Sequence, residues 1–559
     1  MRKWVVWGGV GILSLVIIFL AGWAASQTPM VPRSSAVWSR GKFVGHSPVR
    51  QPVALTTTTT PDGGVYLAWR NMAQQIELAY IEYDGTIRFS TPLALGSQNP
   101  FVPQIAVRPD GRLDIVWLEN SLPQATVWYA QLTSDGDVWQ AGSPISNPDV
   151  PVLSRPQLVV DPAGRRHILW ADENGVQWVI RGAEGDGGNV TGEPIQVAAE
   201  GRAPMARAGV AASEDTLYLV WQEEKDSRLW EIRYAELDAV QGTVRRSGPI
   251  EQVFLRTGQS LGDVSIIPTV EWTYVFWWVQ DFKYVSSQGT YAVFPAGKPE
   301  QRVVGLLPLR HGYDPIEISP LTFQAGDPHP VSTAVLVAMS ATVPDPAAAG
   351  ESYSQIIVAT LDGQAVVDEQ VVSGSVQASL RPTLAEDRDS HQHLVWLDTQ
   401  EFGVYRVVYA STAPDVMANY NAWTFLDVLN QVFAQSFRLS TLLVSLIAAL
   451  VMWAVLPLFF LVVYHLVTSE EILRTTSSWV GLAVAIGLEA LLGFVQPPRL
   501  GMDADWAGAR WVIPAGSVVL AIIATAGFLR RRKYANLFGV YFFFSIINGL
   551  SQMLAYMLL

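Results

Sequence analysis

The segment Arg155–Gly182, RPQLVVDPAGRRHILWADENGVQWVIRG, decides the fold of this chain. It contains three short runs rich in Val, Ile, Leu and Trp, separated by turn residues, as expected for consecutive strands. Degenerate copies recur roughly every 50–60 residues between Gln51 and Ala410, a period typical of propellers and solenoids. The middle of the chain is therefore a repeat architecture.

Two positions align seven copies of the repeat. The first begins the innermost strand, and the second closes the next strand, usually with tryptophan: Trp69, Trp117, Trp170, Trp221, Trp277, Val337 and Trp396. Each four-stranded unit must bury both faces, so seven units are expected to close into a ring. We predict an all-β seven-bladed propeller over 36–412, closed by pairing of 37–44 with the last blade. The tryptophans are expected to be core residues.

Hydropathy predicts a second, membrane-embedded part. The mean hydropathy is +0.22, which soluble chains rarely reach. Arg2 and Lys3 precede an apolar run, Trp4–Ala25, that is long enough to span a bilayer, so 1–25 is an anchor or a signal peptide. A linker and amphipathic helix are expected over 413–438, followed by a four-helix transmembrane domain over 439–559. Its expected spans are Leu439–Leu466, Ser478–Phe494, Trp511–Leu529 and Tyr534–Leu559.

Charge and cysteine content set the orientation and the compartment. If Arg2 and Lys3 are cytoplasmic, alternation of the spans also places the basic cluster 530–533 in the cytoplasm, as the positive-inside rule requires. The propeller and the C-terminus then lie outside the cytoplasm. The absence of cysteine from a large exported domain favours a prokaryotic cell envelope. The expected localisation is multi-pass in the cell membrane.

Composition also excludes several function classes. The formal net charge of −13 argues against nucleic acid as a partner, because an acidic surface repels phosphates. With no cysteine, thiolate metal sites and cysteine nucleophiles are excluded. No phosphate loop, dinucleotide fingerprint or nucleophile elbow occurs in the sequence. We therefore expect no cofactor and no metal site, identify no catalytic residues, and favour a non-enzymatic role.

Charged residues gather where the first strand of a blade begins and the second ends, positions that meet at one mouth of the channel. Arg155, Arg207 and Arg381 begin innermost strands, and Glu119, Asp172, Glu223 and Asp398 follow the repeat tryptophan by two residues. The expected pairs are Arg155 with Asp172, Arg207 with Glu223, and Arg381 with Asp398. They are either salt bridges within blades, each contributing about 0–1 kcal/mol if exposed, or a site for a polar ligand or partner loop.

This arginine triad resembles that of sialidases, propeller enzymes in which three arginines hold the carboxylate of the substrate. The segment Ser134-Asp135-Gly136-Asp137-Val138-Trp139 is similar to the Asp-box turns of those enzymes, Ser-x-Asp-x-Gly-x-Thr-Trp. The chain has Arg-Pro where a sialidase has Arg-Ile-Pro, and no tyrosine nucleophile can be identified. The resemblance implies the blade architecture and not the activity.

Two groups of polar residues remain. Glu489 is the one carboxylate inside an expected span and could contact a stripe on the last span that includes Asn548 and Gln552. That contact would hold the bundle together or relay a proton. His391 and His393 share one face of a strand, and we expect them at the surface.

The leading hypothesis is a membrane-tethered extracytoplasmic propeller that acts as a binding or assembly module of the cell envelope, with a protein partner or polar ligand at its mouth. One alternative is a membrane-anchored glycan hydrolase or lyase that uses the same mouth. A second is an accessory subunit of a transporter or energy-transducing membrane complex.

Overall fold

The computed structural model describes residues 35–48, 55–181 except 109, 121, 123 and 162, 194–197, 204–283 except 214, 286–322 except 311, 334–344, 352–422 except 376, 401 and 402, then 424, 425, 429, 453–495, 509–530 and 535–558. They fall into two compact units. One is a β unit that ends at Ala422, and the other is a helical unit that contains Trp423–Leu559. The N-terminal apolar run lies outside the described residues.

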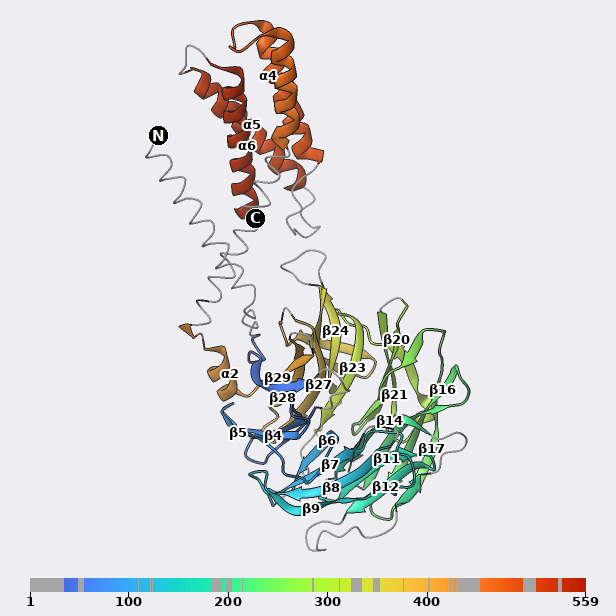
Figure 1. Ribbon diagram of the computed structural model, residues 1–559. Coiled ribbons are helices and arrows are strands. Elements are labelled where there is room, and N and C mark those ends of the chain that lie inside the picture. The colour runs from blue at the N-terminus through green and yellow to red at the C-terminus, as the bar shows by residue number, and fades with distance from the viewer. Residues whose placement is uncertain are drawn as a thin grey trace. The chain divides into compact units, whose positions relative to one another are not determined.

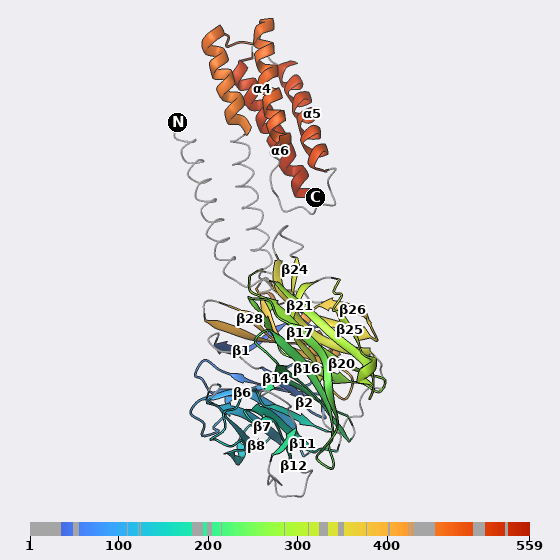
Figure 2. The same ribbon diagram turned by 90° about the vertical axis from the view of Figure 1, so that its right-hand side faces the viewer.

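The β unit is a seven-bladed propeller (Figure 1, Figure 2). In blades 1 to 4 consecutive strands pair antiparallel in sequence order. The strands of blades 1 and 2 are β2 (Thr56–Thr59), β3 (Val65–Arg70), β4 (Ile76–Ile81), β5 (Ile87–Pro92), β6 (Pro100–Val107), β7 (Leu113–Glu119), β8 (Thr126–Leu132) and β9 (Val138–Pro144). Those of blades 3 and 4 are β10 (Gln157–Val160), β11 (Arg166–Asp172), β12 (Gly175–Arg181), β13 (Ile195–Val197), β14 (Pro204–Ser213), β15 (Thr216–Glu224), β16 (Leu229–Asp238) and β17 (Thr243–Phe254).

Blades 5 to 7 depart slightly from this pattern. In blade 5 the innermost strand is split into β18 (Gln259–Leu261) and β19 (Ser265–Pro268), which both pair with β20 (Trp272–Asp281). The remaining elements are β21 (Ser286–Pro295), η1 (Pro299–Gln301), β22 (Val303–Leu306), β23 (Tyr313–Thr322), β24 (Ala334–Pro344), β25 (Ser352–Asp362), β26 (Ala365–Val371), β27 (Ser379–Glu386), β28 (Gln392–Thr399) and β29 (Val404–Ser411). Blades 6 and 7 are joined by a short parallel pairing of β23 with β27.

The ring is closed by a strand that precedes the first blade. β1 (Lys42–Pro48) pairs antiparallel with β29 and forms the outermost strand of blade 7. It begins five residues later than the strand expected over 37–44. β1 also contacts blade 1, where the Trp69 indole N–H donates to His46 O (3.0 Å) and Ser47 Oγ donates to Arg70 O (2.9 Å).

The core lies between neighbouring blades. All six repeat tryptophans are buried, none more than 2% exposed, which confirms their core role: Trp69, Trp117, Trp170, Trp221, Trp277 and Trp396. The helix α2 (Pro414–Asn421) follows blade 7 where the sequence suggested a linker. It packs Val416 into the core between blades 7 and 1, and Asn421 Oδ1 accepts a hydrogen bond from Arg40 N (2.8 Å). The segments that enter and leave the propeller therefore lie side by side.

The helical unit contains Trp453–Thr468, α4 (Thr476–Val495), α5 (Ala509–Arg530) and α6 (Leu537–Leu558). Among the described residues, two stretches rather than four are long and apolar enough to cross a membrane, Thr476–Gly493 and Val512–Arg530. Trp453–Thr468 and Leu537–Gln552 are apolar but shorter. Part of the expected span Leu439–Leu466 lies outside the described residues.

Ring closure can be tested at Gly45 of β1. A Cβ at this position would lie 2.5 Å from Trp69 Cζ2, and Trp69 is 1% exposed. We expect Gly45→Val to destabilise the propeller by about 1–3 kcal/mol, because a packed core side chain must move. The measurement is the melting temperature of the full-length protein in detergent. Gly248→Val in β17 is the control, since a Cβ there has no atom within 4 Å. Equal melting temperatures for the two variants would contradict the role of β1.

Candidate functional site

Charged side chains line the channel at the end where innermost strands begin, called here the Arg155 end. Arg155 precedes β10 of blade 3, and Asp263 lies between β18 and β19 of blade 5. Their side chains form an ion pair of 3.9 Å between Arg155 Nη1 and Asp263 Oδ2. Because blade 4 lies between these blades in the ring, the two side chains must meet in the channel.

Arg381 occupies the equivalent position in blade 7 and pairs with blade 6. Its backbone N–H donates to Glu317 Oε2 (2.7 Å), and its Nη2 lies 3.5 Å from Glu317 Oε1. Both residues have positive φ, 52° for Arg381 and 53° for Glu317. The register of β27 on β28 also shifts between Leu380 and Thr383. This irregularity turns Arg381 away from the neighbouring strand, since a bulge redirects the side chain it carries.

Two of the ion pairs expected within blades are therefore wrong. Arg155 binds Asp263 and not Asp172, and Arg381 binds Glu317 and not Asp398. The third, Arg207 with Glu223, cannot be followed because the side chain of Arg207 lies outside the described part of the chain. The predicted pairs required regular pairing of the first two strands in each blade, so that the start of the first strand lies opposite the end of the second. A bulge shifts this register in blade 7.

The four carboxylates instead anchor the loops of their own blades. Glu119 accepts the backbone N–H groups of Gln98 and Asn99 (both 3.0 Å), as well as the Ser97 hydroxyl. Asp398 Oδ1 accepts hydrogen bonds from the Ser379 hydroxyl (2.6 Å) and from the Trp396 indole N–H (2.8 Å). Burial raises the pKa of Asp398 to about 6, although these hydrogen bonds oppose the shift. A carboxylate used in this way supports the fold rather than contacting a ligand.

Asp172 and Glu223 are also committed within their blades. Asp172 Oδ1 accepts the backbone N–H of Asn174 (2.8 Å) and the amide of Gln177 (3.1 Å). Glu223 is fully buried and pairs with Lys225 Nζ at 2.7 Å and Arg233 Nη1 at 3.4 Å. The acidic half of the expected ligand site is thus turned into the blades, whereas Arg155 and Arg381 pair with carboxylates of other blades.

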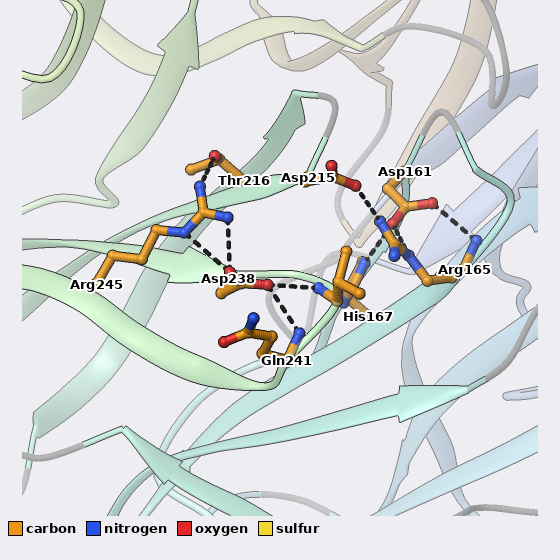
Figure 3. A network of polar contacts seen from close by, with 9 residues as sticks. Asp161, Arg165, His167, Asp215, Thr216, Asp238, Gln241 and Arg245 are labelled. Carbon is orange, nitrogen blue, oxygen red and sulfur yellow. Dashed lines mark hydrogen bonds and ion pairs between the residues drawn. The ribbon is translucent and has the colours of Figure 1, made fainter.

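The opposite end of the blades carries a second polar network, on the turns of blades 3 and 4 (Figure 3). Asp161 Oδ2 lies 3.1 Å from His167 Nε2 and also accepts Arg165. Arg165 Nη2 reaches Asp215 Oδ1 (3.2 Å) and so links the two blades. Burial alone would raise the pKa of Asp161, but the hydrogen bonds from His167 and Arg165 lower it.

Blade 7 repeats this arrangement with His391, His393 and Asp387. His393 is buried rather than at the surface, with Nε2 3.1 Å from Asp387 Oδ2 and Nδ1 2.8 Å from the Tyr409 hydroxyl. Burial lowers the pKa of His393, although the Asp387 carboxylate opposes that shift. Because His393 and Asp387 are both buried, this pair anchors the blade internally and is not accessible to a substrate.

A pocket of about 600 Å³ opens on blades 4 and 5, at the end of β15 and the start of β18. Residues from the β15–β16 loop and from the 255–261 linker line it, including Arg228, Trp230 and Arg256. Sequence reasoning missed this site because neither arginine occupies a repeat position. Asp263, in contrast, begins an innermost strand in the alignment, and its charge opposite to Arg155 was a usable signal.

In the helical unit, Glu489 of α4 and Asn548 of α6 are in contact. Asn548 Nδ2 donates to Glu489 Oε1 (3.1 Å), and Gln552 Nε2 donates to Asn548 Oδ1 (3.3 Å). All three side chains are buried. Over the residues that the structure describes, no three His, Asp or Glu side chains are grouped as metal ligands would be.

No protein-family model matches this chain, and no curated protein does. Solved structures match at low identity. A polysaccharide lyase of family PL25, an ulvan lyase bound to -[GlcA(1-4)Rha3S]-, is 10% identical, with a TM-score of 0.42 over 66% of this chain and 95% of that one. The BP39L lectin from Burkholderia pseudomallei is 11% identical, with a TM-score of 0.39 over 64% and 98%. An exo-1,5-alpha-L-arabinanase from a bovine ruminal metagenomic library is 11% identical, with a TM-score of 0.29 over 49% and 99%. Similarities this low do not bear on what the chain binds.

The buried histidine of blade 7 makes stability depend on pH. His393 has a folded-state pKa below its unfolded value of about 6.5, so the unfolded chain binds the proton more readily. The contribution of neutral His393 to the free energy of unfolding is complete above the unfolded-state pKa. It is lost as the pH falls through the lower pKa of the folded state. We expect the melting temperature to fall between pH 8 and pH 5 more steeply in the native protein than in His393→Asn. The exposed His46→Asn is the control; a slope unchanged by His393→Asn would contradict the assignment.

Proposed function

We propose that this protein is a membrane-tethered β-propeller, displayed outside the cytoplasm, that binds a protein partner or polar ligand at the Arg155 end of its propeller. Thr476–Gly493 and Val512–Arg530 would cross the membrane, and the shorter apolar helices Trp453–Thr468 and Leu537–Gln552, with the N-terminal apolar run, would complete the tether. Membrane tethering, the first part, and recognition, the second, rest on different features of the molecule.

The distribution of side chains in the helical unit carries the first part. Its outer faces expose large apolar residues on three helices, among them Val480, Val484, Leu491, Val519, Ile523, Phe542 and Ile546. Seven polar side chains within its helices are instead buried: Ser478, Glu489, Ser517, Thr525, Ser545, Asn548 and Gln552. A water-soluble bundle has the opposite distribution, whereas a bundle in lipid satisfies its polar groups internally.

Loop contacts support the proposed orientation. Ile472, before α4, pairs with Asn536, before α6, and Leu537 N donates to Glu471 O (2.9 Å). The two loops therefore lie at the same end of the helical unit. The basic cluster 530–533 belongs to one of them, so the positive-inside rule favours the cytoplasm for both. On the β unit, the contact of Arg40 with Asn421 lets both connecting segments approach one membrane.

The orientation can be tested directly, because the native chain has no cysteine. Single cysteines at Ser143, exposed on β9, and Ser469, exposed before α4, replace serine with minimal change in size. A membrane-impermeant maleimide added to intact cells should label Ser143→Cys and leave Ser469→Cys unlabelled, because only the propeller is outside. Both should be labelled after permeabilisation. Labelling of Ser469→Cys in intact cells would refute the topology.

The Arg155 end supports the recognition part. Arg155 and Arg381 each place a guanidinium group opposite a carboxylate of another blade, at 3.9 Å from Asp263 and 3.5 Å from Glu317. A guanidinium carries five N–H donors and can bind the carboxylate or phosphate of a ligand in a bidentate manner. A glycan hydrolase or lyase has less support. Of the three His–Asp pairs among the described residues, those of His167 and His393 are buried, and the third joins His391 to the same buried Asp387 carboxylate.

Recognition is tested by what copurifies with the full-length protein from its native membrane. The double variant Arg155→Gln, Arg381→Gln should lose the copurifying partner or ligand, because both channel guanidinium groups are removed. Arg302→Gln, which alters an exposed arginine beside η1, is the matched control. Recovery of the same partner in equal amount with the double variant would refute a role for the channel arginines.

Glu489 favours a second candidate function, an accessory subunit of a transporter or energy-transducing complex. Its Oε2 has no hydrogen-bond partner in the described part of the chain, and its side chain is fully buried. Burying an ionisable group within a membrane helix costs free energy, so such a group is a candidate for a functional role. The direct contact with Asn548 equally suits a structural role in joining α4 to α6.

A further inference from the structure

The pocket on blades 4 and 5 has a local charge opposite to that of the whole protein. Two exposed arginines, Arg228 and Arg256, line it, and none of its lining residues is acidic. The chain as a whole carries −13. Neither guanidinium forms an ion pair with any residue that the structure describes. The pocket is thus a small cationic site on an acidic body, which favours an anionic ligand.

Among the described residues, the nearby acids do not line the pocket and form no ion pair with these arginines. Glu223 and Glu231 share Lys225 and Arg233, at distances of 2.7–3.4 Å, in a set of two acids and two bases. Asp226 Oδ1 accepts the backbone N–H groups of Arg228 and Leu229 (both 2.8 Å). Asp226 and Asp281 lie nearby without lining the pocket, and the charged side chains among the lining residues are Arg228 and Arg256.

The two segments that carry the arginines are fixed relative to each other. Leu255 N donates to Arg228 O (2.8 Å) and joins the linker to the β15–β16 loop. Gln259 Oε1 accepts Arg256 N (2.9 Å), while Gln259 Nε2 donates to Asp281 Oδ2 (3.1 Å). A site whose loops are held before binding loses less entropy when a ligand arrives.

Aromatic residues border the same site. Trp230 lines the pocket and also packs against the core cluster of blades 4 and 5, so its indole is rigidly held. Phe254 and Phe282 are 63% and 61% exposed. Phe254 directly precedes the lining residue Leu255, and Phe282 N donates to Gly258 O (2.9 Å). The hydroxyls of Ser227, Thr257 and Ser260 complete the lining.

We propose that this pocket binds an acidic sugar, a carboxylate-bearing pyranose within an oligosaccharide or polysaccharide. The inference rests on the proposed extracytoplasmic location and specifies the ligand class. Arg228 and Arg256 bind the carboxylate, Trp230 stacks on the apolar face of the ring, and the hydroxyl side chains bind the sugar hydroxyls. A volume of about 600 Å³ lies within the range of small-ligand sites, roughly 300–1,000 Å³.

The test is isothermal titration of the full-length protein in detergent with trigalacturonate. Maltotriose, a neutral trisaccharide, and a hexaglutamate peptide are titrated in parallel. We expect trigalacturonate alone to bind, and Arg228→Gln and Arg256→Gln to weaken it about tenfold each, because each removes a charge-assisted hydrogen bond. Trp230→Ala should lower the affinity for trigalacturonate and make the binding enthalpy less favourable. Arg302→Gln is the matched control, with affinity unchanged.

Three results would overturn the proposal: no binding of trigalacturonate, equal binding of hexaglutamate, or affinity unaffected by both arginine substitutions. Melting temperatures of the variants exclude misfolding as a cause of lost binding. Cysteine labelling of the same variants reports the topology separately, so failure of the ligand assignment and failure of membrane tethering are distinguishable. Product analysis of the titrated trigalacturonate shows whether the site also cleaves it.

Discussion

The structure of the β unit depends on one pairing, that of β1 with β29. A blade has two apolar faces, and each is buried only while a neighbour covers it, so an open array would expose the faces at both ends. β1 prevents this by completing blade 7 while it contacts blade 1 through Ser47 and the carbonyl of His46. The core between blades 7 and 1 is consequently continuous, with Trp69 and Leu67 packed against Val395 and Tyr409.

Closure of the ring also decides where the chain enters and leaves it. Because the outermost strand of blade 7 comes from the N-terminal side, Arg40 lies within hydrogen-bonding distance of Asn421, just beyond the last blade. α2 strengthens this junction, since the Asn419 side chain donates to Asp84 O (2.8 Å) in blade 1. A propeller that begins and ends at one place is suited to tethering through both termini.

Buried carboxylates stabilise different loops at the two ends of the blades. At the turns around Asp161 and Asp387, carboxylates are buried beside histidine and accept backbone N–H groups, which fixes the loops between the first and second strands. At the Arg155 end, the carboxylates of Glu119 and Asp398, which follow the repeat tryptophan, hold the segments that lead into blades 2 and 7. Charged residues at repeat positions therefore support the fold first. The residues that we propose for binding, Arg381, Arg228 and Arg256, lie instead at a bulge or on irregular linkers.

The sequence by itself determined the seven blades, the buried tryptophans and the polar stripe of the last helix. Each follows from local periodicity, which repeats along the chain or around a helix. Only the tertiary structure decided the partners of the charged residues. The bulge at Arg381 and the meeting of Arg155 with Asp263 depend on backbone irregularities and on distances across the ring that no local pattern encodes. The pocket of blades 4 and 5 could not be predicted either, because it is built from a loop and a linker outside the repeat positions. The pairing of β16 with β17, with Leu229 opposite Phe254, brings these two segments together.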